Sequence, residues 1–168
     1  SAVEPGDLLL LQNETSLQVE AARMASERGM RVLYSAAPFD QDATRAALPF
    51  IDTLLLNEVE AEQLQKALEQ SLFELPVQHI VITLGANGAR WISTHSGDTW
   101  DTPGIKVKAV DTTGAGDTFA GYLAAALVRG FKPAEAMAFA GRAAALKVTK
   151  KGTADAIPTL AEVEAFSP

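Results

Sequence analysis

A glycine-rich turn followed by an acidic residue, Gly114-Ala115-Gly116-Asp117, is the part of the sequence that points most directly to chemistry. The glycines leave the backbone unencumbered, so that consecutive N–H groups can converge on an anion. The residues that follow predict a helix, and the first N–H groups of a helix lack intrahelical partners and lie at the positive end of its dipole. A carboxylate beside a phosphate is unfavourable unless the reaction uses it, and a phosphoryl transfer uses such a base.

The segment therefore predicts a phosphate site at which Asp117 accepts the proton of an attacking hydroxyl. The N–H groups of Ala115, Gly116 and Asp117 would stabilise the charge that develops on the phosphoryl oxygens. A simpler alternative is a tight turn in which Asp117 or Thr113 only caps the helix.

Two further segments carry polar residues at informative spacings. Asn57 and Glu60 follow the apolar run 53–56, and their spacing is that of a capping box, in which each side chain accepts a hydrogen bond from the backbone N–H of the other residue. The turn at residues 85–88, Gly-Ala-Asn-Gly, is explained equally well by a β-hairpin without any ligand. From these residues alone, local structure accounts for both segments as well as binding does.

The elements that must position these residues alternate along the chain, because short apolar runs are followed by helical patterns. Strands are expected over residues 8–11, 31–34, 53–56, 80–84 and 90–93, with a further strand through residue 100. Helices are expected over residues 15–28, a short stretch from 42, 58–69, 117–129 and 133–149. This alternation predicts an α/β fold with a mainly parallel sheet. No linker divides the chain, so we expect residues 1–168 to form a single domain.

The composition excludes several classes of function. A formal net charge of −7 and a pI near 4.8 argue against nucleic acid or an anionic membrane as a partner. Hydrophobic residues make up 48% of the chain, enough for a sizeable core. The chain has no cysteine, which excludes disulfides and thiolate metal sites, and no apolar run of membrane-spanning length. We expect a cytoplasmic protein.

Taken together, the segments resemble motifs of one family, the PfkB or ribokinase-like carbohydrate kinases. Residues 111–121 (DTTGAGDTFAG) resemble its C-terminal signature, and residues 57–60 (NEVE) its Asn-x-x-Glu motif. Residues 83–88 (TLGANG) are similar to its nucleotide-site strand and turn, and residues 147–152 (KVTKKG) to the loop after its penultimate helix. Order and spacing match from Leu8 to about Phe166, and the ribokinase branch is the most similar. The resemblance implies a three-layer α/β/α fold, with helices on both faces of the sheet, that uses ATP to phosphorylate a carbohydrate hydroxyl.

The resemblance also implies a nucleotide site. The residues near the nucleotide would be Asn57, Thr83, Gly85, Gly88 and Gly116. Gly141 stands where ribokinases place a larger side chain over the adenine, and close approach of two helices is the alternative reading of this glycine. Glu60 would order Mg²⁺ through its waters, because Mg²⁺ keeps most of its hydration shell.

Two further sites follow from the resemblance. Loops that hold a monovalent cation such as K⁺, mostly through carbonyl groups, would contain Asp111, Thr113, Lys147, Lys150 and Gly152. The alternatives are that Asp111 only forms a turn and that the lysines only favour a helix C-terminus. Glu14, just after the first strand, would contact sugar hydroxyls, with a solvated acid as its alternative.

One departure limits these expectations: family members are considerably longer than this chain. The missing N-terminal part holds another glycine-rich signature, most sugar contacts and a β-rich lid, so we expect a C-terminal fragment. Three hypotheses follow from this. The chain is part of a kinase for ribose, fructose, 2-keto-3-deoxygluconate or a nucleoside; it is a nucleotide-binding half without catalysis; or it self-associates, for example as a homodimer, through exposed strand edges.

Overall fold

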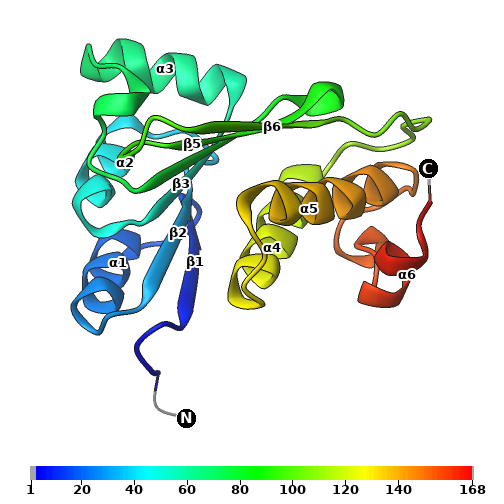
Figure 1. The fold of residues 1–168 in the computed structure, drawn as a ribbon, viewed down its shortest axis with the longest axis horizontal. Coiled ribbons are helices and arrows are strands. Elements are labelled where there is room, and N and C mark those ends of the chain that lie inside the picture. Colours follow the sequence, from blue (N-terminus) through cyan, green and yellow to red (C-terminus); the bar gives the residue numbers. More distant parts are fainter. Residues whose placement is uncertain (1–2, 168) are drawn as a thin grey trace. The chain divides into compact units, whose positions relative to one another are not determined.

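The computed structural model describes residues 3–167, and their contacts form two compact units (Figure 1). The first unit contains the described residues up to Thr83 together with Trp91–Thr99. The second contains Leu84–Arg90 together with the described residues from Trp100 onward. The expected single domain stays a prediction.

The first unit is built from strands and helices that alternate along the chain. Its parallel strands are β1 (Leu8–Gln12), β2 (Arg31–Ser35), β3 (Thr53–Asn57) and β4 (His79–Thr83). The helices that connect them are α1 (Gln18–Glu27), α2 (Gln41–Ala47) and α3 (Glu58–Leu68). Each connection leads to the adjacent parallel strand, and such crossovers are right-handed. The three helices therefore lie on one face of β1–β4, as Figure 1 shows in blue to green.

The three middle residues of β2, β3 and β4 are apolar and buried, as expected for parallel strands covered on both faces. Val32, Leu33 and Tyr34 of β2 are buried, as are Leu54–Leu56 of β3 and Ile80–Ile82 of β4. Strand β1 lies at the edge of the sheet, and all five of its residues are half-buried. Strands β5 (Gly88–Ser93) and β6 (Thr99–Pro103) follow β4, so the sheet order is β1-β2-β3-β4-β5-β6.

The second unit contains three helices, α4 (Ala115–Val128), α5 (Pro133–Val148) and α6 (Leu160–Ala165). Pro133 begins α5 at the first helical position, where its missing N–H is not needed. Helices α4 and α5 pack against each other, and small buried residues such as Ala120 and Ala140 allow close approach. Aromatic rings complete this contact: the ring of Phe139 meets those of Tyr122 and Phe131 edge-on, with centroids 5.3 and 5.6 Å apart.

The predicted α/β class and mainly parallel sheet are confirmed, with differences at the ends of elements. The expected helix start at residue 15 is wrong: α1 begins at Gln18, because Leu17 adopts a left-handed conformation with φ 65°. Helix α4 begins at Ala115 and not at residue 117, since Gly114 (φ 74°) already starts it. Among residues 3–167, no helix is long and apolar enough to cross a bilayer.

Candidate active site

At the start of α4, Asp117 is exposed to solvent, while the residues that follow it are buried. Gly114 is the N-cap residue with φ 74° and ψ 10°, so Asp117 is the third residue of the helix. Thr118 and Phe119 directly behind it are buried. The hydroxyl of Thr118 donates to the carbonyl of Gly114 at 2.8 Å, and its N–H donates to the same oxygen at 3.0 Å. These contacts fix the turn, while the carboxylate of Asp117 stays exposed.

The backbone amides of this turn divide into two groups. The N–H of Ala115 donates to the carbonyl of Thr112 at 3.1 Å, so it is engaged inside the turn, contrary to its predicted part in phosphate binding. Within residues 3–167, the N–H groups of Gly114 and Gly116 donate to no protein acceptor. Helix α4 also begins without a side-chain cap, so Thr113 does not cap it. Two amides of the turn and the positive end of the helix dipole are therefore available to an anion.

Asp111 anchors the loop that leads into this turn. Its Oδ1 accepts from the N–H of Thr113 and its Oδ2 from the N–H of Gly152, each at 3.0 Å. The hydrogen bond from Gly152, followed by those from Thr113, lowers the pKa of Asp111 to about 2, and the charge of Lys147 adds to this effect. These contacts go beyond a local turn, because they join the α4 loop to the segment after α5.

Lys147 lies beneath the same loop. Its side chain is completely buried, and its Nζ donates to the backbone carbonyl of Asp111 at 3.1 Å. The carbonyl of Val148 accepts from the N–H groups of Val110 and Asp111 at 2.7 and 3.1 Å. The structure thus brings together Asp111, Thr113, Lys147 and Gly152, and their assignment to a cation site stays a prediction. Since Lys147 is buried, it does not present its charge to solvent as a surface lysine would.

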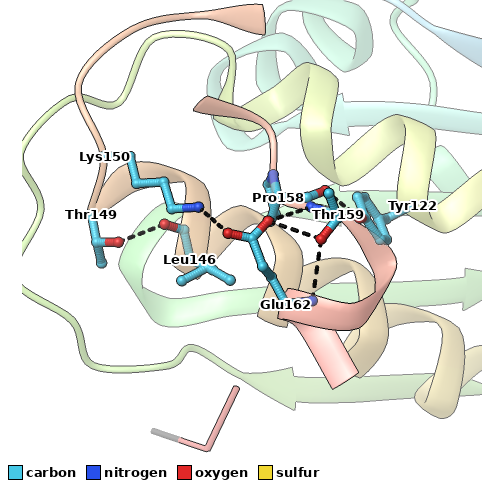
Figure 2. Close-up of polar contacts among 7 residues, drawn as sticks. All are labelled: Tyr122, Leu146, Thr149, Lys150, Pro158, Thr159 and Glu162. Carbon is cyan, nitrogen blue, oxygen red and sulfur yellow. Dashed lines mark hydrogen bonds and ion pairs between the residues drawn. The ribbon is translucent and has the colours of Figure 1, made fainter. Parts of the chain in front are cut away.

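The segment after α5 is held at both ends (Figure 2). At its start, Lys150 pairs with Glu162 of α6 at 2.6 Å, and this pairing is the main reason that the pKa of Glu162 is lowered to about 2. At its end, the hydroxyl of Tyr122 donates to the carbonyl of Pro158 at 2.5 Å. The ammonium group of Lys150 thus pairs with an acid of α6. These contacts link the segment that carries Gly152 to α6 and to α4.

Asn57 and Glu60 form the capping box that their spacing predicts. Asn57 Oδ1 accepts from the N–H of Glu60 at 2.9 Å, and Glu60 Oε2 accepts from the N–H of Asn57 at 2.8 Å. Asn57 is exposed at the carboxyl end of β3, and Thr83 is its register partner on β4. Because a carboxylate has further lone pairs, Glu60 fits a role in holding waters of Mg²⁺.

The structural reason for glycine differs among the positions of the predicted nucleotide site. A Cβ at Gly88 would lie 2.0 Å from the carbonyl oxygen of Thr102, so close passage of β6 demands glycine there. Gly85 has a left-handed φ of 56° and open space around it. A Cβ at Gly141 would meet nothing within 4 Å, so the alternative reading of this glycine, a close approach of two helices, is wrong. Open space beside Gly141 leaves room for a ligand.

Glu14 is exposed in the turn after β1, and the residue that organises this corner is its neighbour Asn13. The amide of Asn13 donates to the carbonyls of Ala36 and Pro38 at 3.1 Å each, and its oxygen accepts from the hydroxyl of Tyr34. Sequence reasoning missed Asn13. The available signal was a polar residue at the carboxyl end of an apolar strand, where open α/β sheets bind ligands.

Comparison with known proteins gives a consistent result. The model of the pfkB carbohydrate kinase family matches residues 3–160. A ribokinase of Haemophilus influenzae is 38% identical over 176 residues, covering 98% of this chain and 56% of that protein. The crystal structure of Thermotoga maritima ribokinase is 35% identical with a TM-score of 0.81, over 95% of this chain and 56% of that one. Arabidopsis thaliana ribokinase complexed with ribose and ATP is 28% identical with a TM-score of 0.81, over 95% and 56% of the respective chains.

The chain thus spans about half the length of the relatives that it matches. The predicted ribokinase-like α/β fold is confirmed by these structures. Both the motifs and the matches over nearly the whole chain lead to the same assignment: the chain belongs to the pfkB family of carbohydrate kinases.

Proposed function

We propose that this chain supplies the nucleotide-binding and catalytic residues of an ATP-dependent sugar kinase, with Asp117 as the general base. The observation that carries the proposal is the start of α4, where an exposed carboxylate follows a glycine turn with two amides free of protein acceptors. This combination suits a reaction that brings a hydroxyl and a phosphate together.

In the proposed reaction, Asp117 accepts the proton of the sugar hydroxyl as its oxygen attacks the γ-phosphorus of ATP. A new O–P bond forms, the bond between the γ-phosphorus and the bridging oxygen breaks, and the electron pair leaves with ADP. The amides of Gly114 and Gly116, at the positive end of α4, stabilise the charge on the phosphoryl oxygens. Asp117 also orients the hydroxyl, which makes its position as important as its basicity.

Asn57 and Glu60 have a proposed role towards the nucleotide. Asn57 would contact phosphate, and Glu60 would hold Mg²⁺ through water, as its capping-box geometry still allows. Mg²⁺ supplies charge neutralisation to the phosphates when bound. Thr83, Gly85 and Gly88 would border the nucleotide, and Glu14 would contact the sugar.

The main alternative is a nucleotide-binding half without catalysis. ADP production with ATP and a panel of ribose, deoxyribose, fructose, 2-keto-3-deoxygluconate and nucleosides separates the two. Sugar-dependent ADP release by this chain supports the kinase, and the preferred sugar defines its substrate. ATP binding with no sugar-dependent turnover, in this chain and in any longer form, would overturn the kinase proposal. A cytoplasmic location and a homodimer remain predictions, to be tested by fractionation and by sizing.

A further inference from the structure

Lys147 is the most unusual charged residue in the described part of the chain. It stands in the last turn of α5, and its side chain is 0% exposed. Lysine is almost never fully buried unless its charge is matched by suitable partners. Here the stem lies on the apolar face of α5, in register with Ala136, Ala140 and Ala143, and the ammonium group ends at the loop of Asp111. A buried charge in this place therefore needs an explanation.

The surroundings of the ammonium are those of a cation site. Its Nζ donates to the carbonyl of Asp111 at 3.1 Å, and the charge of Lys147 is one of the causes that lower the pKa of the Asp111 carboxyl. The C-terminal end of α5 adds the negative end of a helix dipole. A carbonyl oxygen, the charge of a nearby carboxylate and a helix C-terminus all favour a single positive charge.

The resemblance to ribokinases implies a monovalent cation held by these same loops, and the residues present do not fit a further one at this point. The carbonyl of Asp111 already accepts from Lys147, and both carboxylate oxygens accept from backbone N–H groups at 3.0 Å. An ammonium group matches K⁺ in charge and in its preference for oxygen atoms. A second cation beside it would be repelled by the buried charge of Lys147.

We propose that the ammonium group of Lys147 replaces the monovalent cation, so that this chain orders its anion-binding turn without added K⁺. Lys147 acts here as a positioning residue, through Asp111 and the turn at Gly114. A Cβ placed on Gly114 would lie 3.9 Å from Cε of Lys147 and 3.8 Å from Oδ2 of Asp117, so the lysine stem runs directly beneath the turn. The fixed charge holds the loop and adds positive potential where phosphate is expected to bind.

The test compares the unmodified chain with Lys147→Ala in KCl and in N-methylglucamine chloride at equal ionic strength. Lys147→Ala removes the charge and leaves space that K⁺ can enter. Lys151→Met serves as the matched control, since it removes a positive charge from an exposed neighbour at the same helix end. Two quantities are measured: the Kd for ATP by calorimetry and the melting temperature (Tm) by circular dichroism. The Kd readout rests on the proposed function, whereas the Tm readout does not.

The unmodified chain and Lys151→Met are expected to bind ATP equally well in both salts, within about twofold, and to keep the same Tm within about 1 °C. Lys147→Ala should bind ATP about tenfold or more weakly in N-methylglucamine, because a hydrogen bond from a charged donor is lost. KCl should restore much of its affinity and of its Tm.

Three results would overturn the proposal. They are an unmodified chain whose Kd or Tm depends strongly on K⁺, a Lys147→Ala variant that matches the unmodified chain, and a loss in this variant that K⁺ does not restore. If Lys147→Ala fails to fold in either salt, the K⁺ dependence of the unmodified chain decides alone. If the unmodified chain binds no ATP in either salt, the proposed function fails, and the Tm comparison still tests the role of Lys147.

Discussion

Replacing Asn57 by aspartate separates its structural role from its proposed contact with phosphate. In the structure, Asn57 caps α3 by accepting from the N–H of Glu60 at 2.9 Å, and its side chain is exposed. Aspartate has an oxygen in the same place and caps a helix as well as asparagine does. The substitution therefore keeps the capping box and adds one negative charge at the carboxyl end of β3.

The two effects differ greatly in size. The helix dipole favours the new negative charge, whereas Glu58 and Glu60 in the same turn repel it. The free energy of unfolding should therefore change by no more than about 0.5 kcal/mol. A phosphate charge 4 Å away would be repelled by about 1 kcal/mol in water and about 4 kcal/mol at an effective dielectric constant near 20. The Kd for ATP should rise by about fivefold to several hundredfold.

The assay pairs calorimetric ATP binding with urea unfolding of Asn57→Asp. Ser71→Asp is the matched control, because Ser71 also forms a capping box, with Glu74, and also gains one negative charge. This control should leave the Kd for ATP unchanged. If Asn57→Asp binds ATP as tightly as the unmodified chain, Asn57 does not contact phosphate and only caps α3. If it loses more than about 1 kcal/mol of stability, the capping account is wrong.

The remaining predictions concern pH, backbone space and Mg²⁺. The folded pKa of Asp111, about 2, lies below the ordinary 3.8, so its ionised form stabilises the fold above pH 3.8 and this contribution is lost as pH falls towards 2. Acid unfolding of Asp111→Asn should accordingly vary less with pH in that window than unfolding of the unmodified chain, and equal slopes would contradict this. In urea unfolding, the free energy of unfolding of Gly88→Ala should be lower by more than about 2 kcal/mol, since the new Cβ would overlap the carbonyl oxygen of Thr102. Gly141→Ala, with open space, should be neutral or gain up to about 1 kcal/mol, and equal losses in the two variants would refute the distinction. Glu60→Gln keeps an acceptor for the N–H of Asn57, so its Tm should hold while more Mg²⁺ is needed for ATP binding; an unchanged Mg²⁺ requirement would remove Glu60 from that role.

Much of the fold could be predicted because its strands and helices depend on residues that lie close together in the sequence. The apolar runs that became β2, β3 and β4 are bounded by polar residues and turns, and burial on both faces explains their composition. The start of α1 could not be predicted, because Leu17 is an exposed leucine in a left-handed conformation. Residues other than glycine rarely adopt this conformation, so the residue type does not indicate it. The capping box at Asn57 and Glu60 was predictable, since it depends on residues only three positions apart.

The parts of the site that escaped prediction depend on contacts between distant segments. The burial of Lys147 follows from the loop of Asp111, which lies 36 residues away, although its helical spacing from Ala136, Ala140 and Ala143 carried a signal. The need for glycine at position 88 comes from the passage of β6. The engagement of the Ala115 N–H with Thr112 depends on the conformation of the turn, which the glycines permit but do not specify.

Asp117 is proposed as the base of a phosphoryl transfer. The most direct test of this role is the turnover of Asp117→Asn in a form of the protein that phosphorylates its sugar, measured together with the Kd for ATP. We expect kcat to fall by about 10²–10⁴-fold with the Kd nearly unchanged, because asparagine keeps the shape of the side chain and loses the proton acceptor. An Asp117→Asn variant that retains its kcat would contradict this role.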